Sequence, residues 1–242
     1  MSLIITLYVR EGIVMASDSR LTLNVEQKST AGQSTLLAVG QSDSVYKTFL
    51  TPTRVGISTY GDAAIGGVPI AGFVDSFIND IVAPGDLAVD GVADEVLKYF
   101  QRQQPVPNTG FHVAGYVEQE GVLTQRVWNV SVKANQKQHI NAPGAPGASW
   151  GGEADILTRL LQPLAQIDAA GNIVKQLPQY AIPWQFFTLQ DAIDFAIFAV
   201  RSTIEALRFQ PRAKTVGGPV DVLVIKPKEA FWVQQKALGV RT

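Results

Sequence analysis

Apolar residues dominate the start of the chain. Residues 3–9 and 13–16 are apolar almost without a break, and Arg10, Glu11 and Gly12 separate the two runs. Two short apolar runs joined by a Gly-containing connection predict a β-hairpin. Strands without polar alternation are typical of positions that are covered on both faces. The pattern therefore predicts a deeply buried hairpin at the beginning of the fold.

The side chains at the ends of this hairpin carry the first candidate chemistry. Ser2 precedes the first run, and Asp18 follows the second. With a three-residue loop over residues 10–12, Ile4 faces Asp18, so Ser2, Ile4 and Asp18 share one face. A two-residue loop at residues 11–12 would move Asp18 to the other face. We therefore expect the three-residue loop or a compensating bulge.

The rest of the chain groups its strands around paired helices. Apolar segments predict strands at residues 35–39, 44–50, 54–59, 111–117, 122–132, 220–225 and 230–233, and a short polar strand is expected at residues 135–140. Helical periodicity predicts helices over residues 68–82, 92–104, 153–165 and 189–208. Loops or connections are expected at residues 21–33, 141–152 and 167–187. This order predicts an α+β fold with two sheets face to face and helices outside, in a single domain over residues 1–242.

Composition narrows the function. The 242 residues are 46% hydrophobic and 17% charged, with a net charge of -1, which gives no reason to expect nucleic acid or a membrane as a partner. The absence of cysteine excludes disulfides, thiol catalysis and zinc-thiolate sites. The two histidines, His112 and His139, lie on different predicted strands and are expected to be structural. With no long apolar run and no signal-peptide pattern, we expect a soluble cytoplasmic protein without cofactor or metal.

Two segments at opposite ends of the chain resemble one family. The segment GIVMASDSR (residues 12–20) resembles the signature of proteasome β-subunits, and so does VGGPVDVLVI (residues 216–225). The resemblance spans nearly the whole chain and implies the four-layer αββα sandwich of N-terminal nucleophile (Ntn) hydrolases. The absence of a propeptide and the additional length after Ile167 favour the bacterial relative called the betaproteobacterial proteasome homologue, with Anbu as the second choice.

This resemblance implies an active site. The nucleophile of the family, a threonine, falls on Ser2, and its acidic partner falls on Asp18. The arginine of the signature falls on Arg20, and the following lysine falls on Lys47. The residue whose backbone N–H helps to bind the oxyanion falls on Ser58, where the family has glycine. Without the resemblance, an Asp18–Lys47 pair is equally well a plain buried ion pair.

Two departures from the family pattern matter. The serine-glycine pair of the family corresponds to residues 149–152, and either Ser149 or Trp150 takes the place of the serine. The aspartate and the serine that flank the family's active site are replaced within residues 213–216, where Thr215 is the only hydroxyl. The chain thus loses a carboxylate that orients the terminus, which predicts weak catalysis or a different support for it.

The implied reaction is amide hydrolysis through an acyl-enzyme. Ser2 Oγ attacks the carbonyl, and the α-amine of Ser2, freed by removal of Met1, acts as the base. The resemblance also implies peptide or unfolded polypeptide substrates, a homo-oligomeric single or double ring and an ATP-dependent unfoldase as partner. A catalytically weak or silent ring scaffold and a small-molecule amidase on the same fold are the alternatives. The apolar face of the last predicted helix, which includes Ala196 and Val200, fits either the core or a neighbouring subunit.

Overall fold

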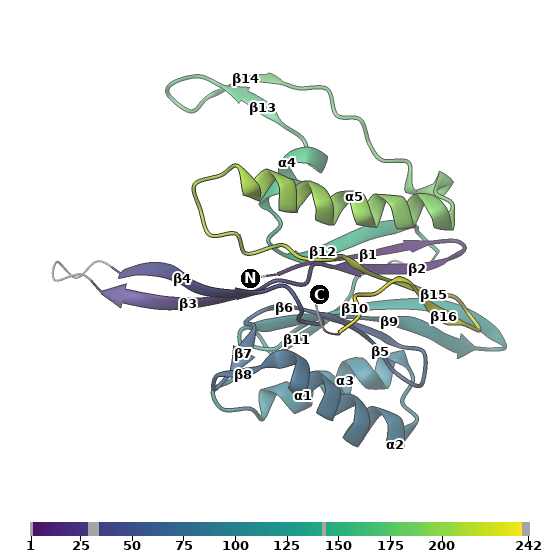
Figure 1. Ribbon diagram of the computed structural model, residues 1–242. Coiled ribbons are helices and arrows are strands. Elements are labelled where there is room, and N and C mark those ends of the chain that lie inside the picture. Colours follow the sequence, from purple (N-terminus) through teal and green to yellow (C-terminus); the bar gives the residue numbers. More distant parts are fainter. Residues whose placement is uncertain (1, 29–33, 142–143, 239–242) are drawn as a thin grey trace.

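Two five-stranded antiparallel sheets lie face to face in the computed structural model, which describes residues 2–28, 34–141 and 144–238 (Figure 1). The strands of the first sheet, in spatial order, are β12 (Gly147–Gly152), β1 (Leu3–Val9), β2 (Gly12–Ser17), β15 (Asp221–Ile225) and β16 (Ala230–Gln234). Those of the second are β11 (Gln136–His139), β10 (Val122–Ser131), β9 (Thr109–Gln119), β6 (Gly56–Gly61) and β5 (Thr48–Leu50).

Helices cover the outer face of each sheet. Above the first sheet lie α4 (Asp155–Leu161) and α5 (Leu189–Arg208), and below the second lie α1 (Ile70–Phe77), a π-helical turn (Ile78–Val82), α2 (Ala83–Gly85) and α3 (Val89–Gln101) (Figure 1). The 3₁₀ turn Trp184–Phe186 leads toward α5. Helix α5 begins with a capping box, because Thr188 Oγ1 accepts from the Asp191 N–H and the Asp191 carboxylate accepts from the Thr188 N–H.

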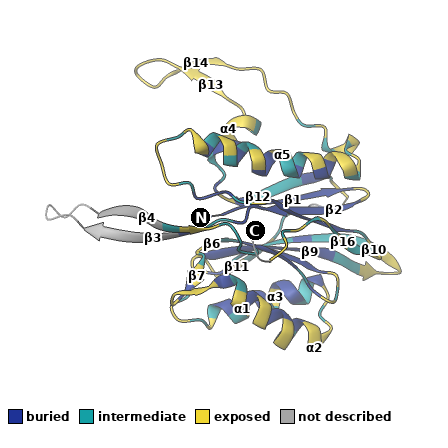
Figure 2. Ribbon diagram, viewed as in Figure 1, coloured by how far each residue is buried: buried dark blue, intermediate teal, exposed yellow. Residues whose placement is uncertain are grey.

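The hairpin of β1 and β2 is buried at every position of both strands (Figure 2). One face packs on α4 and α5, with Leu3 and Val14 among the contacts, and the other packs on the second sheet through Ile13 and Met15. Coverage on both faces explains why neither strand alternates polar with apolar residues. Ala196 and Val200 of α5 are fully buried in this same core, so that face of the helix serves the core.

The hairpin register differs from the prediction. Ile4 pairs with Ser17, so the loop consists of residues 10–11 and the three-residue loop is wrong. In the observed register Asp18 falls opposite Leu3, and its N–H donates to the Leu3 carbonyl at 3.2 Å. Strand β2 ends at Ser17, and the Asp18 carboxylate turns back to accept the Leu3 N–H at 3.0 Å. The strand register therefore does not put Asp18 on the face of Ser2 and Ile4, as we expected, and the chain after β2 brings the Asp18 carboxylate to the Leu3 N–H instead.

Three stretches predicted as loops contain strands. Residues 21–28 form β3 (Leu21–Lys28), which pairs with β4 (Ser34–Ser42) in a two-stranded ribbon. The alternation of Leu21, Leu23 and Val25 with polar residues is a strand signal that the loop prediction missed. Within the long connection, β13 (Ala165–Ile167) pairs with β14 (Ile173–Gln176). The end of the 141–152 segment forms β12, which pairs with β1 along its whole length.

The glycine-rich sequence of β12 was predicted to be a loop, but its glycines let the strand pass close to two tyrosine rings. A Cβ at Gly147 would lie 2.9 Å from the Tyr8 ring, and one at Gly151 would lie 2.6 Å from the Tyr60 ring. Glycine within a strand commonly marks such contacts. The predicted strand over residues 44–50 is also shorter than expected, since only Thr48–Leu50 pairs.

Two further short elements complete the described chain. Strands β7 (Ala64–Ile65) and β8 (Val68–Pro69) form a small ribbon before α1.

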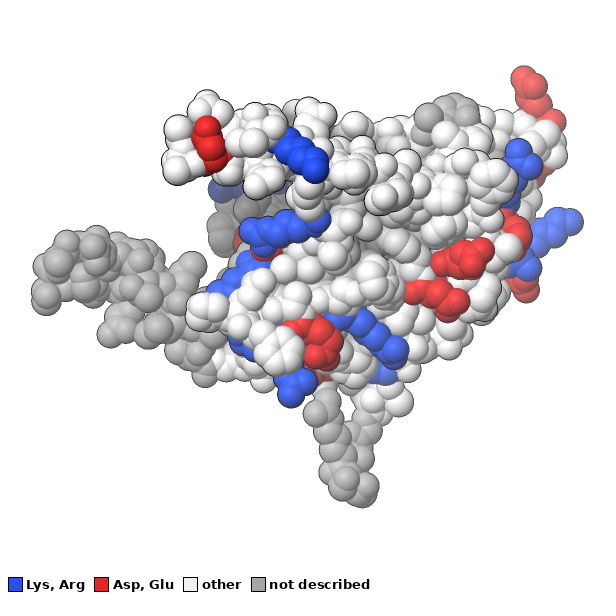
Figure 3. All heavy atoms as spheres, turned by 90° about the horizontal axis from the view of Figure 1, so that it is seen from above, with Lys and Arg blue, Asp and Glu red and all other residues white. Residues whose placement is uncertain are grey.

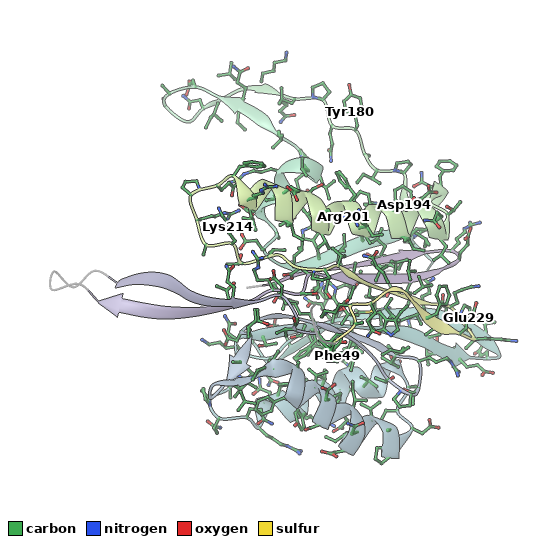
Figure 4. The ribbon with its side chains drawn as sticks, viewed as in Figure 1. Phe49, Tyr180, Asp194, Arg201, Lys214 and Glu229 are labelled. Carbon is green, nitrogen blue, oxygen red and sulfur yellow. The ribbon has the colours of Figure 1, made fainter. Side chains whose placement is uncertain are left out.

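The β13–β14 arm projects above α5 with its residues exposed (Figure 2), and Tyr180 beside it is 89% exposed and points away from the body (Figure 4). Seen from above, charged side chains are scattered in small groups of both signs (Figure 3). Over the described residues, no helix is long and apolar enough to cross a membrane.

Candidate active site at the amino-terminal end of the hairpin

A buried ion pair lies where β1 begins and β2 ends. Lys47 Nζ donates to Asp18 Oδ1 at 2.7 Å, and the two side chains are 4% and 0% exposed. Burial lowers the pKa of Lys47 below its ordinary value, and the adjacent Asp18 carboxylate opposes this shift only in part. Lys47 is therefore a lysine that can lose its proton more readily than a surface lysine.

The Asp18 carboxylate is held by four donors. Oδ1 accepts from the Leu3 N–H as well as from Lys47, and Oδ2 accepts from the N–H groups of Arg20 and Gly217, both at 3.0 Å. A buried carboxylate needs such partners to offset the loss of hydration. Both segments that resemble the proteasome signatures thus meet at Asp18, since Gly217 belongs to the second one.

Ser2 directly precedes Leu3, the residue whose N–H binds the Asp18 carboxylate. Its side chain is buried, and its carbonyl accepts the Glu153 N–H at 2.8 Å. Because the Leu3 N–H and Lys47 Nζ share Asp18 Oδ1, the ammonium group lies next to the peptide that joins Ser2 to Leu3. The structure therefore places Ser2 beside the buried Asp18–Lys47 pair.

Gly152 is the close neighbour of Ser2 on β12. A Cβ on Gly152 would lie 1.7 Å from the Ser2 carbonyl oxygen, and the residue has a φ of +94°. No side chain fits at that distance, and positive φ favours glycine. The second glycine of the Gly151-Gly152 pair is thus required where β12 passes the amino-terminal serine.

Arg20 binds groups around the Asp18–Lys47 pair and connects segments that are distant in the sequence. Its guanidinium binds Asp43 through two bonds, Nε to Oδ1 at 2.7 Å and Nη2 to Oδ2 at 2.8 Å, which raise the pKa of Arg20 further above its ordinary value. A third, longer bond of 3.5 Å reaches the carbonyl of Lys214, on the connection between α5 and β15 (Figure 4). Arg20 therefore ties that connection to the end of β2.

Ser58 lies in the middle of β6. Its Oγ is 2.9 Å from Thr48 Oγ1, which donates to Ser17 Oγ at the same distance. The Thr59 N–H donates to the Lys47 carbonyl at 2.8 Å, toward the β5 side. Because N–H groups alternate along a strand, the Ser58 N–H points to the other side, where Ser58 pairs with His112 of β9. This geometry does not favour the Ser58 amide as an oxyanion donor.

Ser149 is not brought to Ser2. It pairs with Thr6, four residues further along β1, which corresponds to about 13 Å along the strand. Its Oγ lies 3.5 Å from His112 Nε2, and Thr6 Oγ1 lies 2.9 Å from His112 Nδ1. Burial lowers the pKa of His112 to about 4, so this histidine is neutral at physiological pH. Trp150 packs against the helix-side core.

One carboxylate at the site was missed in the sequence. The Glu153 side chain is buried, and its two oxygens accept from Thr215 Oγ1 at 2.9 Å and from Arg212 Nη1 at 3.0 Å. The sequence signal that could have identified Glu153 is its position directly after the Gly151-Gly152 pair. Among the described residues, no group of three or more histidine, aspartate or glutamate side chains is arranged to hold a metal ion.

Comparisons with known proteins were made for both sequence and fold. The sequence matches no family model, and no curated protein matches it significantly. The fold is similar to that of many solved chains, among them a Gly-1 mutant of Anbu from Hyphomicrobium sp. strain MC1. That match has a TM-score of 0.58 at 15% identity and covers 93% of this chain and 82% of the Anbu chain. The chain therefore has a fold similar to that of Anbu.

Proposed function

We propose that this chain is an Ntn peptidase subunit of the proteasome type, in which Ser2 is the nucleophile. The observation that carries the proposal is the convergence of Ser2, Asp18 and Lys47 at one buried point of a proteasome-like fold. The two facing sheets with helices outside are, on this proposal, the four-layer αββα sandwich of that class. Assignment to the betaproteobacterial homologue rather than to Anbu stays a prediction.

The proposed reaction has two balanced steps. Once Met1 has been removed, the α-amine of Ser2 takes the Oγ proton while Oγ attacks the peptide carbonyl. The tetrahedral intermediate collapses, the C–N bond breaks, and the amine passes its proton to the leaving amine. Water, deprotonated by the same α-amine, then attacks the Ser2 ester, which releases the carboxylic acid and regenerates the hydroxyl.

The charges around Ser2 suit this reaction. An α-amine titrates near ~7.7–8 and can accept and return a proton close to neutral pH. The Lys47 ammonium favours the neutral form of that amine and stabilises the negative charge that develops on oxygen. Asp18 holds Lys47 in place, and Arg20 fixes the connection that leads to Gly217. The proposal assigns no catalytic role to Ser58 or to Ser149.

A peptide-hydrolysis assay tests the proposal. Protein that begins at Ser2 is compared with Ser2→Ala and with Lys47→Met on a panel of fluorogenic peptides. The control is Ser76→Ala, which changes an exposed serine on α1. We expect both site variants to lose at least about 99% of the wild-type rate and the control to keep it. Equal rates in wild type and Ser2→Ala would overturn the proposal.

The partners are part of the same proposal. A ring of identical subunits would place the Ser2 sites in a shared chamber, and an ATP-dependent unfoldase would feed it unfolded polypeptide. Both follow from the resemblance to proteasome β-subunits. Sedimentation analysis of the purified protein tests the ring, and a monomer at micromolar concentration would contradict it.

A further inference from the structure

The active site lacks the carboxylate that the proteasome pattern places before the second signature, where this chain has residues 213–216. The structure holds another carboxylate close to the same place. Glu153 follows Gly152 directly, is buried, and donates its N–H to the Ser2 carbonyl. Its backbone is therefore fixed to the nucleophile residue itself.

The Glu153 carboxylate is aimed by the segment that lost the aspartate. Thr215 Oγ1 donates to Oε2, and Thr215 is itself only 2% exposed. Two residues later, Gly217 donates to Asp18. The segment thus holds Glu153 with one residue and Asp18 with another, and both residues also bond to the peptide that joins Ser2 to Leu3, Glu153 through its N–H and Asp18 through its carboxylate.

Glu153 also has capacity left to bind a further donor. Each of its oxygens accepts one described bond, from Thr215 or from Arg212, and an ionised carboxylate offers about four acceptor sites. Arg212 does not depend on Glu153, because its Nη2 also binds both oxygens of Asp155, at 3.1 and 2.9 Å. A purely structural clamp between Arg212 and the start of α4 would be complete without Glu153.

We propose that Glu153 is a positioning residue that holds the free amino group of Ser2 for catalysis, in place of the family's aspartate. This proposal rests on the proposed function for its catalytic meaning. The carboxylate accepts a hydrogen bond from the α-amino group and so directs the lone pair of the amino nitrogen at Ser2 Oγ. The negative charge also stabilises the ammonium form of that group. The loss near Ala213 is thereby compensated by the residue that directly follows β12.

The test measures the amino group directly. Chains that begin at Ser2 are produced by cleavage of an amino-terminal ubiquitin fusion and checked by intact mass. The pH dependence of α-amine acetylation is followed by mass spectrometry of the amino-terminal peptide, and epoxyketone labelling is measured in parallel. The variants are Glu153→Gln and Thr215→Val, and the control is Asp155→Asn, which neutralises the neighbouring carboxylate but leaves the bonds of Glu153 to Thr215 and Arg212 in place.

Removal of the Glu153 charge should lower the pKa of the α-amine by about 0.5–1 unit. It should also slow epoxyketone labelling at pH 7 by about tenfold, whereas Asp155→Asn should change neither. Thr215→Val, which keeps the carboxylate but frees it, should shift the pKa in the same direction by a smaller amount and serves if Glu153→Gln does not fold. A folded Glu153→Gln protein with an unchanged α-amine pKa would overturn the inference, and so would an equal shift in Asp155→Asn.

The two proposals fail differently in this experiment. If wild-type protein forms no epoxyketone adduct but its α-amine pKa falls in Glu153→Gln, the peptidase proposal fails and Glu153 still holds the terminus. If the adduct forms in every variant at the wild-type rate, with equal α-amine pKa values, hydrolysis stands and the role of Glu153 is refuted.

Discussion

Lys47 Nζ lies 2.7 Å from Asp18 Oδ1, and both groups are almost completely shielded from solvent. Asp18 directly follows the second strand of the amino-terminal hairpin, while Lys47 immediately precedes β5 of the other sheet. This ion pair therefore links the two sheets at the point where Ser2 enters the fold. The ion pair stabilises the fold and also belongs to the proposed active site, and mutagenesis can separate these two roles.

Loss of Lys47 should be costly for stability. Lys47→Met leaves the buried Asp18 carboxylate without its cation, and breaking such a pair costs about 3–5 kcal/mol. Chemical denaturation measures this as a lower free energy of unfolding. The double variant Lys47→Met/Asp18→Asn should recover part of the loss, because it no longer buries an unpaired charge. A single variant as stable as wild type would contradict the described pairing.

The glycine beside Ser2 should be irreplaceable. Gly152→Ala forces a Cβ toward the Ser2 carbonyl oxygen, where the available distance is 1.7 Å. Gly121→Ala is a matched control, because Gly121 also has positive φ, +78°, but no heavy atom lies within 4 Å of its Cβ position. We expect about 1 kcal/mol of destabilisation in the control and a much larger loss, or failure to fold, in Gly152→Ala. Equal melting temperatures would show that β12 does not approach Ser2 this closely.

Acid should destabilise the protein through His112. The pKa of His112 is about 4 in the folded protein, against an ordinary value of 6.5. Between these values the unfolded chain binds more protons than the folded one, so the free energy of unfolding falls as the pH decreases from about 6.5 to 4. The contribution of this one group is on the order of 3 kcal/mol.

His112→Gln isolates that contribution. Glutamine keeps a polar contact with Thr6 but does not titrate in this range. Unfolding curves at several pH values between 4 and 7 should show a shallower pH dependence for the variant than for wild type. Parallel curves for the two proteins would mean that His112 is not buried in its neutral form.

The capping box of α5 should matter for stability but not for the site. Thr188→Ala removes the bond from the Asp191 N–H, which is worth about 1 kcal/mol. Thermal unfolding should show the loss, while the rate of Ser2 labelling should stay at the wild-type value. A labelling defect in this variant would indicate that α5 affects the site across the first sheet.

How far the sequence predicted this fold depends on how local each signal is. The capped helix over residues 189–208 and the hairpin of β9 and β10 carry their signals in their own residues, and the structure has both. Strand β12 is different, because its glycines are needed only where Tyr8 and Tyr60 pack against them. That requirement depends on partners far away in the chain, so the segment resembled a loop.

The same reasoning applies to the site. Ser2 and Asp18 were predicted from the spacing of the segment 12–20, and Lys47 was predicted as the lysine that follows it in the family. The hairpin loop was one residue shorter than predicted, yet the Asp18 carboxylate still reaches Lys47 because the residue follows the last paired position of β2. Glu153 could not be assigned, since its role depends on Thr215 and Arg212, which approach it only in the folded chain.

The central claim is that the amino group and the hydroxyl of Ser2 act together as base and nucleophile. Intact-mass measurement after incubation with a peptide epoxyketone tests this most directly, because the hydroxyl adds to the ketone and the free amine opens the epoxide, with no atom lost. We predict a chain that lacks Met1 and carries one complete inhibitor molecule, and no adduct in Ser2→Ala. A Met1-free chain that stays unmodified, or an adduct that persists in Ser2→Ala, would contradict the claim.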